Sequence, residues 1–563
     1  MNLEEKIALW KNFNGLEEDL KDELFKMNEA ELADAFTDDL AFGTGGLRGI
    51  LGAGTNRMNT YIVSKATLGF GRYLSKFKNA YSKGIAISHD NRHKSKEFAL
   101  QSAKVLASLG YKVYLFSDLR PTPELSYAVR YFKAIGGIMI TASHNPKEYN
   151  GYKIYDENGC QLIPSMADQV INEIGNIKDY FSIEDNKNLN NIVYVDKEVD
   201  NSYIKRVKEI VLNKDQEKRV KMVYTPLHGT GSVFAADVLS SVGYDVNPLM
   251  IQMTNDPDFS NVKSSNPENH EAYDEAIEYA DEINASLVLA TDPDGDRLGC
   301  VVKHKGAWIY LTGNETGALV LNYIVNRREE LNTIPANPYL FTTIVSGSMP
   351  CAIAEKHGLN VETVLTGFKF IGDKAEQLEK SKKGTYLFGF EESYGFLASD
   401  FVRDKDSIQA ILMLAEAACF YDNRGMTLYD GLEELYKEYG YYKEGITNIV
   451  LKGLAGKAKI VSTLEYFRNN EISLPSFKIT KKEDYTLHKS FNYLTKETKE
   501  INLPTSNVIK YHLNDDMWFV LRPSGTEPKL KVYYGVKGKT SEKALEKLSL
   551  LEKEILEIVN KLV

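Results

Sequence analysis

Short apolar runs alternate with amphipathic stretches along most of the chain. Residues 83–140 show this pattern most clearly. The runs expected to form strands are 84–88, 112–116 and 138–140, and the periodic segments expected to form helices are 95–109 and 123–132. Strands that alternate with helices pair in parallel while the helices cross over the sheet, so the pattern predicts an α/β fold. The same alternation starts again near residues 220 and 311.

The two ends of the chain read differently from its middle. Residues 3–36 have helical periodicity with many carboxylates and predict a surface helical lead-in. The last block, from about residue 427, opens with a predicted helix at 428–441 and closes with another at 542–562. Its interior, 478–507, contains turn residues and alternating patches that the pattern does not order.

Length and charge limit the possible classes of protein. A chain of 563 residues is too long for one core and indicates three to four domains of ~100–200 residues. The hydrophobic content of 43% and charged content of 26% are those of an ordinary globular protein. The net charge of -10 argues against a nucleic-acid partner, so an anionic substrate would need a locally positive site.

Cysteine usage and the first residues bear on the compartment. The four cysteines lie far apart and form no CxxC pair, which favours a reducing environment. The first ten residues are acidic and amphipathic, unlike a signal peptide, and no stretch approaches the ~20 apolar residues of a membrane span. We therefore expect a cytoplasmic protein.

The loop after the apolar run 138–140 carries the first candidate chemistry. The string Thr141-Ala-Ser-His-Asn-Pro146 places Ser143 and His144 at the carboxyl end of a predicted strand, where open α/β sheets bind their ligands. A serine beside an imidazole and a lysine can carry a group through a covalent intermediate, and nearby positive charge favours phosphate. Taken alone, the Ser-His pair is also compatible with a surface turn.

A second centre follows the predicted strand 285–291. Asp292-Pro-Asp-Gly-Asp-Arg297 offers carboxylates at i, i+2 and i+4, which can converge on one hard cation. The EF-hand loop fits poorly, because Arg297 occupies its glycine position and Lys303 its twelfth. Magnesium is the natural cation for phosphoryl transfer, although a structural acidic turn remains an alternative.

Three further loops carry weaker signals. In Phe42-Gly-Thr-Gly-Gly-Leu-Arg-Gly49, backbone amides and Arg48 can approach a phosphate, or the glycines simply form a flexible turn. Glu391-Glu-Ser393 suits sugar hydroxyls, or is an ordinary turn. Arg522-Pro-Ser-Gly-Thr526 forms either an anion cradle or a plain hairpin.

These motifs together resemble the α-D-phosphohexomutase family, and they recur in the family's order from Gly43 to Lys529. The resemblance implies a four-domain α/β chain, with three similar mixed α/β sheet domains and a C-terminal α+β domain around a central cleft. The domains would span 1–205, 206–312, 313–430 and 431–563.

The resemblance also implies roles for individual residues. Ser143 would carry the phosphoryl group, and its phosphoserine oxygen would complete a Mg²⁺ site with Asp292, Asp294 and Asp296. Arg48 would reach the phosphoserine as a catalytic residue. Residues that would contact the phosphate or sugar of the substrate are Arg297, Lys369, Glu391 and Ser393. Residues that would hold the phosphate that is not transferred are Arg522, Ser524, Gly525 and Thr526. His144 and Lys153 are both candidates for proton transfer or charge stabilisation near the serine, and the sequence does not decide which of them is the base. Arg92 is interpreted mainly as a loop-forming residue, with an electrostatic role at the site as the alternative, and His228 mainly as a structural or hinge residue.

The implied activity is interconversion of glucose 1-phosphate and glucose 6-phosphate through a phosphoserine, with glucose 1,6-bisphosphate as intermediate and activator. The sugar loop is more similar to the family's glucose-type form than to its mannose-type form. Alternatives within the family are a phosphopentomutase, a phosphomannomutase and a sugar-bisphosphate synthase; outside it, a phosphoserine-type sugar phosphatase. The expected partners are sugar phosphates, with the chain a monomer or a homodimer.

Overall fold

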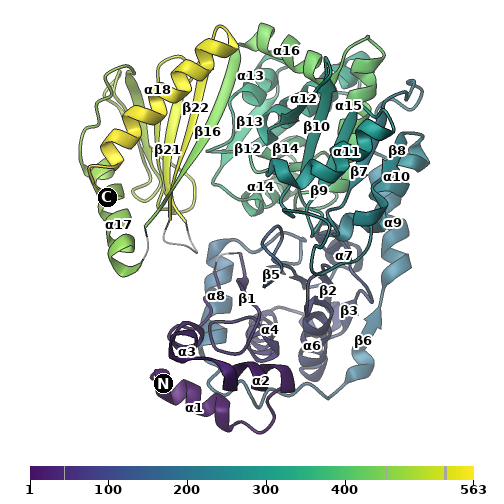
Figure 1. Cartoon of the computed structure of the whole chain (residues 1–563), viewed down its shortest axis with the longest axis vertical. Helices are drawn as coiled ribbons and strands as arrows, with labels where there is room; N and C mark the ends of the chain where they lie inside the picture. The colour runs from purple at the N-terminus through teal and green to yellow at the C-terminus, as the bar shows by residue number, and fades with distance from the viewer. Residues whose placement is uncertain (44, 452, 525–528, 563) are drawn as a thin grey trace.

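Four β-sheets, each built from one continuous stretch of chain, organise the molecule (Figure 1). The computed structural model describes residues 1–43, 45–451, 453–524 and 529–562. The first sheet lies at the bottom of Figure 1, the second and third at the upper right, and the fourth at the upper left. Three sheets are mixed and carry helices, and the fourth is antiparallel, so the predicted fold class is confirmed.

The first sheet has the order β1-β5-β4-β2-β3-β6. Its strands are β1 (Leu47–Ile50), β2 (Ile85–His89), β3 (Val113–Leu115), β4 (Gly136–Ile140), β5 (Tyr149–Tyr155) and β6 (Ile192–Tyr194). Its helices are α4 (Thr60–Leu74), α5 (Ala80–Lys83), α6 (Ser95–Ser108), α7 (Thr122–Phe132) and α8 (Pro164–Gly175), with the 3₁₀ turn η1 (Leu189–Asn191). Every residue of β2 and β4 is buried, because helices cover both faces of the parallel part of the sheet.

The acidic lead-in forms three short helices under the first sheet, as predicted (Figure 1). They are α1 (Leu3–Asn12), α2 (Glu18–Lys26) and α3 (Glu29–Phe36). Asn2 and Asn28 cap α1 and α3 by accepting the N3 backbone N–H. Trp10 is completely buried and donates its indole N–H to Tyr180 Oη at 2.9 Å, which fastens the helices to the domain.

The second sheet has the order β11-β10-β9-β7-β8 and is reached through α9 (Asp196–Lys208). Its strands are β7 (Lys221–Thr225), β8 (Asp245–Pro248), β9 (Leu287–Thr291), β10 (Leu298–His304) and β11 (Ala307–Leu311). Its helices are α10 (Ala235–Val242) and α11 (Asp274–Glu282), with the 3₁₀ turns η2 (Thr230–Val233), η3 (Met250–Gln252) and η4 (His270–Tyr273). The 3₁₀ turns η2 and η4 lie just before α10 and α11.

The third sheet has the order β13-β12-β14-β15. Its strands are β12 (Pro338–Thr343), β13 (Asn360–Val364), β14 (Thr385–Glu391) and β15 (Gly395–Leu397). Its helices are α12 (Gly313–Glu330), α13 (Met349–Lys356), α14 (Phe368–Ser381), α15 (Ser407–Asp422) and α16 (Leu428–Tyr439). The prediction of a helix to residue 441 was too long, since Gly440 has a φ of +101° and β16 begins at Tyr441.

The fourth sheet is antiparallel, with the order β16-β22-β21-β20-β17-β18-β19. Its strands are β16 (Tyr441–Val450), β17 (Ile479–Asp484), β18 (Lys489–Asn492), β19 (Thr498–Glu500), β20 (Ile509–Leu513), β21 (Trp518–Pro523) and β22 (Lys529–Gly538). Its helices are α17 (Gly453–Asn469) and α18 (Ser541–Val559). The segment 478–507, which the pattern did not order, forms β17, β18 and β19.

A continuous group of buried apolar side chains joins the domains, reaching from the first sheet to Trp518 and Val520 in the fourth. Polar contacts add to it: Tyr155 in β5 donates to Asp404 Oδ2 at 2.8 Å, and Lys510 in β20 donates to the Ile344 carbonyl at 2.7 Å. The functional loops are therefore held by packing between domains. None of the helices in the described part of the chain has the length and apolar character needed to cross a membrane.

We predict that Gly46→Ala lowers the free energy of unfolding of the first domain by roughly 2–4 kcal/mol. Gly46 has a φ of +115°, and a Cβ there would lie 1.9 Å from the Tyr152 carbonyl oxygen. Urea unfolding followed by circular dichroism measures the loss. Gly306→Ala is the control, because Gly306 also has a positive φ but has nothing within 4 Å of its Cβ position. Equal losses in the two variants would contradict the steric argument.

Candidate active site

The loop between β4 and β5 holds Ser143 at the carboxyl end of the strand, where the sequence predicted it. Ser143 is 3% exposed and has a φ of +54°. Its backbone N–H donates to Thr141 Oγ1 at 2.7 Å, which supports the turn. Its Oγ lies 3.2 Å from His144 Nδ1 and donates to Asp292 Oδ2 at 3.0 Å. The serine of the first domain thus touches the aspartate loop of the second.

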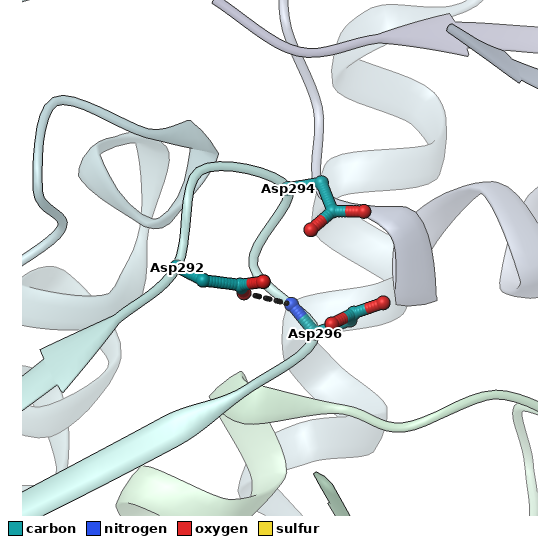
Figure 2. A group of neighbouring side chains, drawn as sticks. All are labelled: Asp292, Asp294 and Asp296. Atoms are coloured by element: carbon teal, nitrogen blue, oxygen red, sulfur yellow. Dashed lines mark hydrogen bonds between the residues drawn. The ribbon is translucent and has the colours of Figure 1, made fainter. Parts of the chain in front are cut away.

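The aspartate loop follows β9 and brings three carboxylates together (Figure 2). Asp292, Asp294 and Asp296 are all buried, and one oxygen from each lies within 4.8 Å of the others. The backbone N–H groups of Asp296 and Arg297 donate to Asp292 Oδ1 at 3.0 and 2.9 Å, which fixes the turn. The spacing i, i+2, i+4 therefore converges as expected for a hard-cation site.

Burial makes this concentration of negative charge costly, and lysines compensate part of it. Burial, reinforced by Asp294 and Asp296, raises the pKa of Asp292 well above its usual range. Burial also acts to raise the pKa of Asp294, but the Lys153 ammonium outweighs it and lowers that pKa. Lys153 Nζ lies 2.6 Å from Asp294 Oδ2 and 3.3 Å from Asp296 Oδ2.

Two carboxylate oxygens of the aspartate cluster, which the lysines do not contact, fit a divalent cation. Asp294 Oδ1 and Asp296 Oδ1 are buried without a hydrogen-bond partner among the described residues. Buried carboxylate oxygens normally have partners, so two such oxygens beside Asp292 call for a cation. The donor set is all oxygen, which suits Mg²⁺ better than a soft metal.

Lys405 is a site residue that the sequence analysis missed. It lies between β15 and α15, and its Nζ is 2.9 Å from Asp296 Oδ2 and 3.9 Å from Glu391 Oε1. It therefore connects the aspartate loop with the predicted sugar loop. The available signal was the charged run 403–406 directly before an apolar helix, since charges in such a place are buried and paired.

The predicted sugar loop lies against the aspartate loop. Glu391 ends β14 with 5% exposure, and burial raises its pKa to about 7. Ser393 is half-buried on the turn that follows. An isolated bridge pairs Arg297 with Gly395, and the Leu298 N–H donates to the Tyr394 carbonyl at 3.0 Å. These backbone contacts set the two loops in register.

Two cationic side chains approach the serine loop. Arg48, exposed on β1, donates from Nη1 to Asn145 Oδ1 at 2.9 Å, so the glycine-rich segment reaches the serine loop as predicted. Arg297 pairs through Nη1 with Glu268 Oε1. Burial, together with the Arg297 and Arg48 charges, holds the pKa of His144 well below its usual range. The imidazole beside Ser143 is therefore neutral.

A second, basic group comes from the third and fourth domains. Arg522 in β21 donates to Tyr533 Oη at 3.4 Å, and Lys369 lies in the first turn of α14. Burial and the nearby Arg522 guanidinium lower the pKa of Lys369 to about 8. The Ser524 N–H donates to the Lys529 carbonyl at 2.7 Å, which closes the hairpin. Gly525 and Thr526, also predicted here, lie outside the described residues.

His228 has a structural role, in keeping with its interpretation from the sequence. It is completely buried, and its Nδ1 lies 3.0 Å from the Thr254 carbonyl oxygen. Its backbone N–H donates to the Gln252 carbonyl at 3.1 Å. The residue therefore ties the turn after β7 to the segment after η3, within the second domain.

Family models cover most of the chain. Residues 39–181, 201–306 and 312–439 match models described as phosphoglucomutase/phosphomannomutase alpha/beta/alpha domains I, II and III. Residues 477–550 match the phosphoglucomutase/phosphomannomutase C-terminal domain. The four matches follow the order of the four sheets.

Individual relatives agree with the family models. A phosphoglucomutase of Staphylococcus epidermidis (strain ATCC 35984) is 40% identical over 521 residues, which cover 91% of this chain and 94% of that one. A phosphoglucomutase of Staphylococcus aureus (strain MSSA476) is 37% identical over 532 residues, covering 93% and 95%. The fold is similar to a phosphoglucomutase/phosphomannomutase family protein from Burkholderia thailandensis, with a TM-score of 0.67, 16% identity and coverage of 92% and 97%. Parafusin from Paramecium gives a TM-score of 0.67, 18% identity and coverage of 92% and 94%.

We predict that Lys405→Met lowers the free energy of unfolding by about 3–5 kcal/mol at pH 8, because it removes the ammonium that Lys405 places beside the buried Asp296 and Glu391 carboxylates. The loss is smaller at pH 6. At pH 6, Glu391, with a folded pKa of about 7, is largely protonated and has no negative charge for Lys405 to compensate. Because this pKa is raised above the unfolded value, the contribution of Glu391 to stability is lost as the pH rises through 7. Urea titrations with EDTA at both pH values measure the two losses.

The matched control is Lys303→Met. Lys303 forms an exposed ion pair with Asp281, so its loss costs less than about 1 kcal/mol. A loss for Lys405→Met as small as that of the control, or equal at pH 6 and pH 8, would show that Lys405 does not compensate the buried carboxylates.

Proposed function

The chain belongs to the phosphoglucomutase/phosphomannomutase family, and from this premise we propose that it interconverts glucose 1-phosphate and glucose 6-phosphate. The observation that carries the proposal is the contact of Ser143 Oγ with Asp292, 3.0 Å apart, at the edge of a buried aspartate cluster. A serine that carries a phosphoryl group needs a cation beside it to compensate the phosphate charge, and the aspartate cluster could hold one. Curated relatives at 37–40% identity are named phosphoglucomutases.

Phosphorylated Ser143 would place one phosphate oxygen next to the three aspartates. These four oxygen donors would hold Mg²⁺, which supplies compensation for the charge on the moving phosphoryl group. Arg48 contacts Asn145 in the serine loop, and Arg297 Nε lies 4.0 Å from Asp292 Oδ2, so both would add fixed positive charge near Ser143. The chain would therefore stabilise the charge that develops as the phosphoryl group moves between Ser143 and a sugar hydroxyl.

His144 is the better candidate for proton transfer at Ser143 Oγ. Its imidazole is neutral because its pKa is depressed, and Nδ1 lies 3.2 Å from Oγ. Burial acts to lower the pKa of Lys153, but Asp294 and Asp296 raise it, so the ammonium stays charged. We propose that His144 takes and returns the proton and that Lys153 holds the aspartates.

The rest of the site would read one sugar in two orientations. Glu391 and Ser393 offer a carboxylate and a hydroxyl for the sugar hydroxyls, while Arg522, Lys369 and Ser524 would hold the phosphate that is not being transferred. A bisphosphate that turns end for end would then return the other phosphate to Ser143. A phosphatase would not need a second phosphate site, and this arrangement favours a mutase.

We predict that purified enzyme converts glucose 1-phosphate to glucose 6-phosphate with Mg²⁺ and a trace of glucose 1,6-bisphosphate. Ser143→Ala lowers kcat more than ~10³-fold, because no other group takes the phosphoryl. Ser165→Ala, an exposed serine change in the same domain, leaves kcat unchanged. A coupled assay that detects glucose 6-phosphate measures both variants.

Parallel assays with mannose 1-phosphate and ribose 1-phosphate decide the substrate. A higher kcat/KM for either one would replace glucose while leaving the phosphoserine mechanism in place. Release of free phosphate without an isomer would identify a phosphatase, and full activity of Ser143→Ala would refute the mechanism itself.

We predict that Mg²⁺ raises the thermal unfolding midpoint. At a Mg²⁺ concentration 100-fold above Kd, the gain in the free energy of unfolding is about 2.7 kcal/mol. Asp294→Asn removes most of this gain, because it withdraws a buried carboxylate from the cluster. The control Asp281→Asn, an exposed aspartate in the same domain, keeps it. An equal midpoint shift in all three proteins would place the cation elsewhere.

A further inference from the structure

Arg92 is a buried arginine whose side chain fills the inside of the serine loop. It follows β2 and is 3% exposed. Its Nη2 donates to the carbonyl oxygens of Ser143 and Asn145, both at 2.5 Å. Its Nη1 donates to the carbonyl oxygens of Pro146 at 2.7 Å and Tyr149 at 3.1 Å. Four carbonyl groups of one loop therefore converge on a single guanidinium group.

The other end of the guanidinium is also held. Its Nε lies 3.2 Å from Asp90 Oδ2 in an ion pair. Asp90 Oδ1 in turn accepts from Ser95 Oγ at 2.6 Å and from the Arg92 backbone N–H at 3.0 Å. Each Nη nitrogen thus donates to two carbonyl oxygens, whereas Nε is ion-paired with Asp90 and has no hydrogen-bond partner among the described residues. Asp90, after β2, and Ser95, at the start of α6, therefore orient the Arg92 side chain, and Arg92 in turn orients the carbonyl groups of the serine loop.

The second domain holds the same loop from outside. The Phe259 ring centroid lies 5.3 Å from Arg92 Cζ, in a cation–π arrangement. Asp258 Oδ1 lies 3.1 Å from Lys147 Nζ, and Ser265 Oγ donates to the His144 carbonyl at 3.3 Å. The serine loop is therefore clamped between Arg92 and the segment 256–265, which belongs to the domain of the aspartate cluster.

This clamping matters because Ser143 does not adopt a relaxed backbone. A φ of +54° is left-handed, and a residue with a Cβ keeps such a conformation only where its surroundings impose it. The Ser143 carbonyl is one of the four that Arg92 binds. The same backbone geometry directs Oγ toward Asp292. Release of the carbonyl would let the serine relax away from the aspartates.

We propose that Arg92 is a positioning residue for phosphoryl transfer: by binding four carbonyl groups of the serine loop, it holds Ser143 Oγ at the aspartate cluster. This inference rests on the proposed function for its kinetic part. Lysine cannot substitute, because its donors radiate from one nitrogen and cannot bridge carbonyls spread along the loop.

The kinetic test is Arg92→Lys. It lowers kcat for glucose 1-phosphate roughly 10²-fold, the effect of a misplacement of about 1 Å at a reacting group. KM changes less than about threefold, because the sugar and the far phosphate are held by the third and fourth domains. Arg72→Lys on α4, an exposed arginine of the same domain, is the matched control and keeps both constants.

A second measurement does not depend on activity. Hydrogen exchange of the amides in residues 141–149 becomes faster in Arg92→Lys, while the amides of β2 and β4 keep their wild-type rates. Guanidinium ion at millimolar concentration restores part of the kcat of Arg92→Ala and has no effect on Arg92→Lys. If neither Arg92 variant folds, Phe259→Leu, which loosens the outer clamp, shows the same loop-specific exchange and a smaller loss of kcat.

Several outcomes would overturn the inference. These are an unchanged kcat in Arg92→Lys, exchange that accelerates across the whole first domain, or wild-type loop exchange in Phe259→Leu when it is the only variant that folds. A wild-type enzyme without mutase activity would refute the proposed function alone, and loop exchange would still decide whether Arg92 holds the serine loop.

Discussion

Three buried carboxylates on one short loop form the constraint on which the rest of the structure depends. Asp292, Asp294 and Asp296 are within 1% of complete burial, where like charges repel strongly and water does not screen them. Their compensation cannot come from their own domain alone. Lys153 reaches them from the first domain and Lys405 from the third. Side chains of three domains therefore meet at the aspartate loop.

The same constraint bears on the positions of Ser143 and His144. Ser143 lies against Asp292, and burial, together with the Arg297 and Arg48 charges, holds the pKa of His144 beside it well below its usual range. The loop that carries both residues is itself held open by Arg92 from one side and by the second domain from the other. The position of the serine loop and the balance of charge around the aspartates therefore depend on each other.

The far end of the site has the opposite character. Burial and its cationic neighbours Arg522 and Lys529 lower the pKa of Lys531, and Lys369 is affected in the same way. Crowded cations of this kind suit an anion, just as crowded carboxylates suit a cation. A substrate with phosphate at one end and a reacting hydroxyl at the other would complement both groups.

The sequence by itself determined the local parts: apolar runs that became buried strands, and loops whose spacing placed Ser143 and the aspartates at strand ends. Such features depend on residues that are close together in the chain, so they can be predicted from the local sequence pattern. The contact of Lys405 with Asp296 and the four-carbonyl contact of Arg92 could not be predicted, because the partners lie 109 and 51 to 57 residues away in the sequence. The strands in 478–507 were hidden for another reason: β17, β18 and β19 pair with near neighbours but are mostly half-buried or exposed, so their apolar pattern is weak. Only tertiary packing decides which distant charges meet, since it removes water and makes each buried charge depend on a partner that the local sequence does not contain.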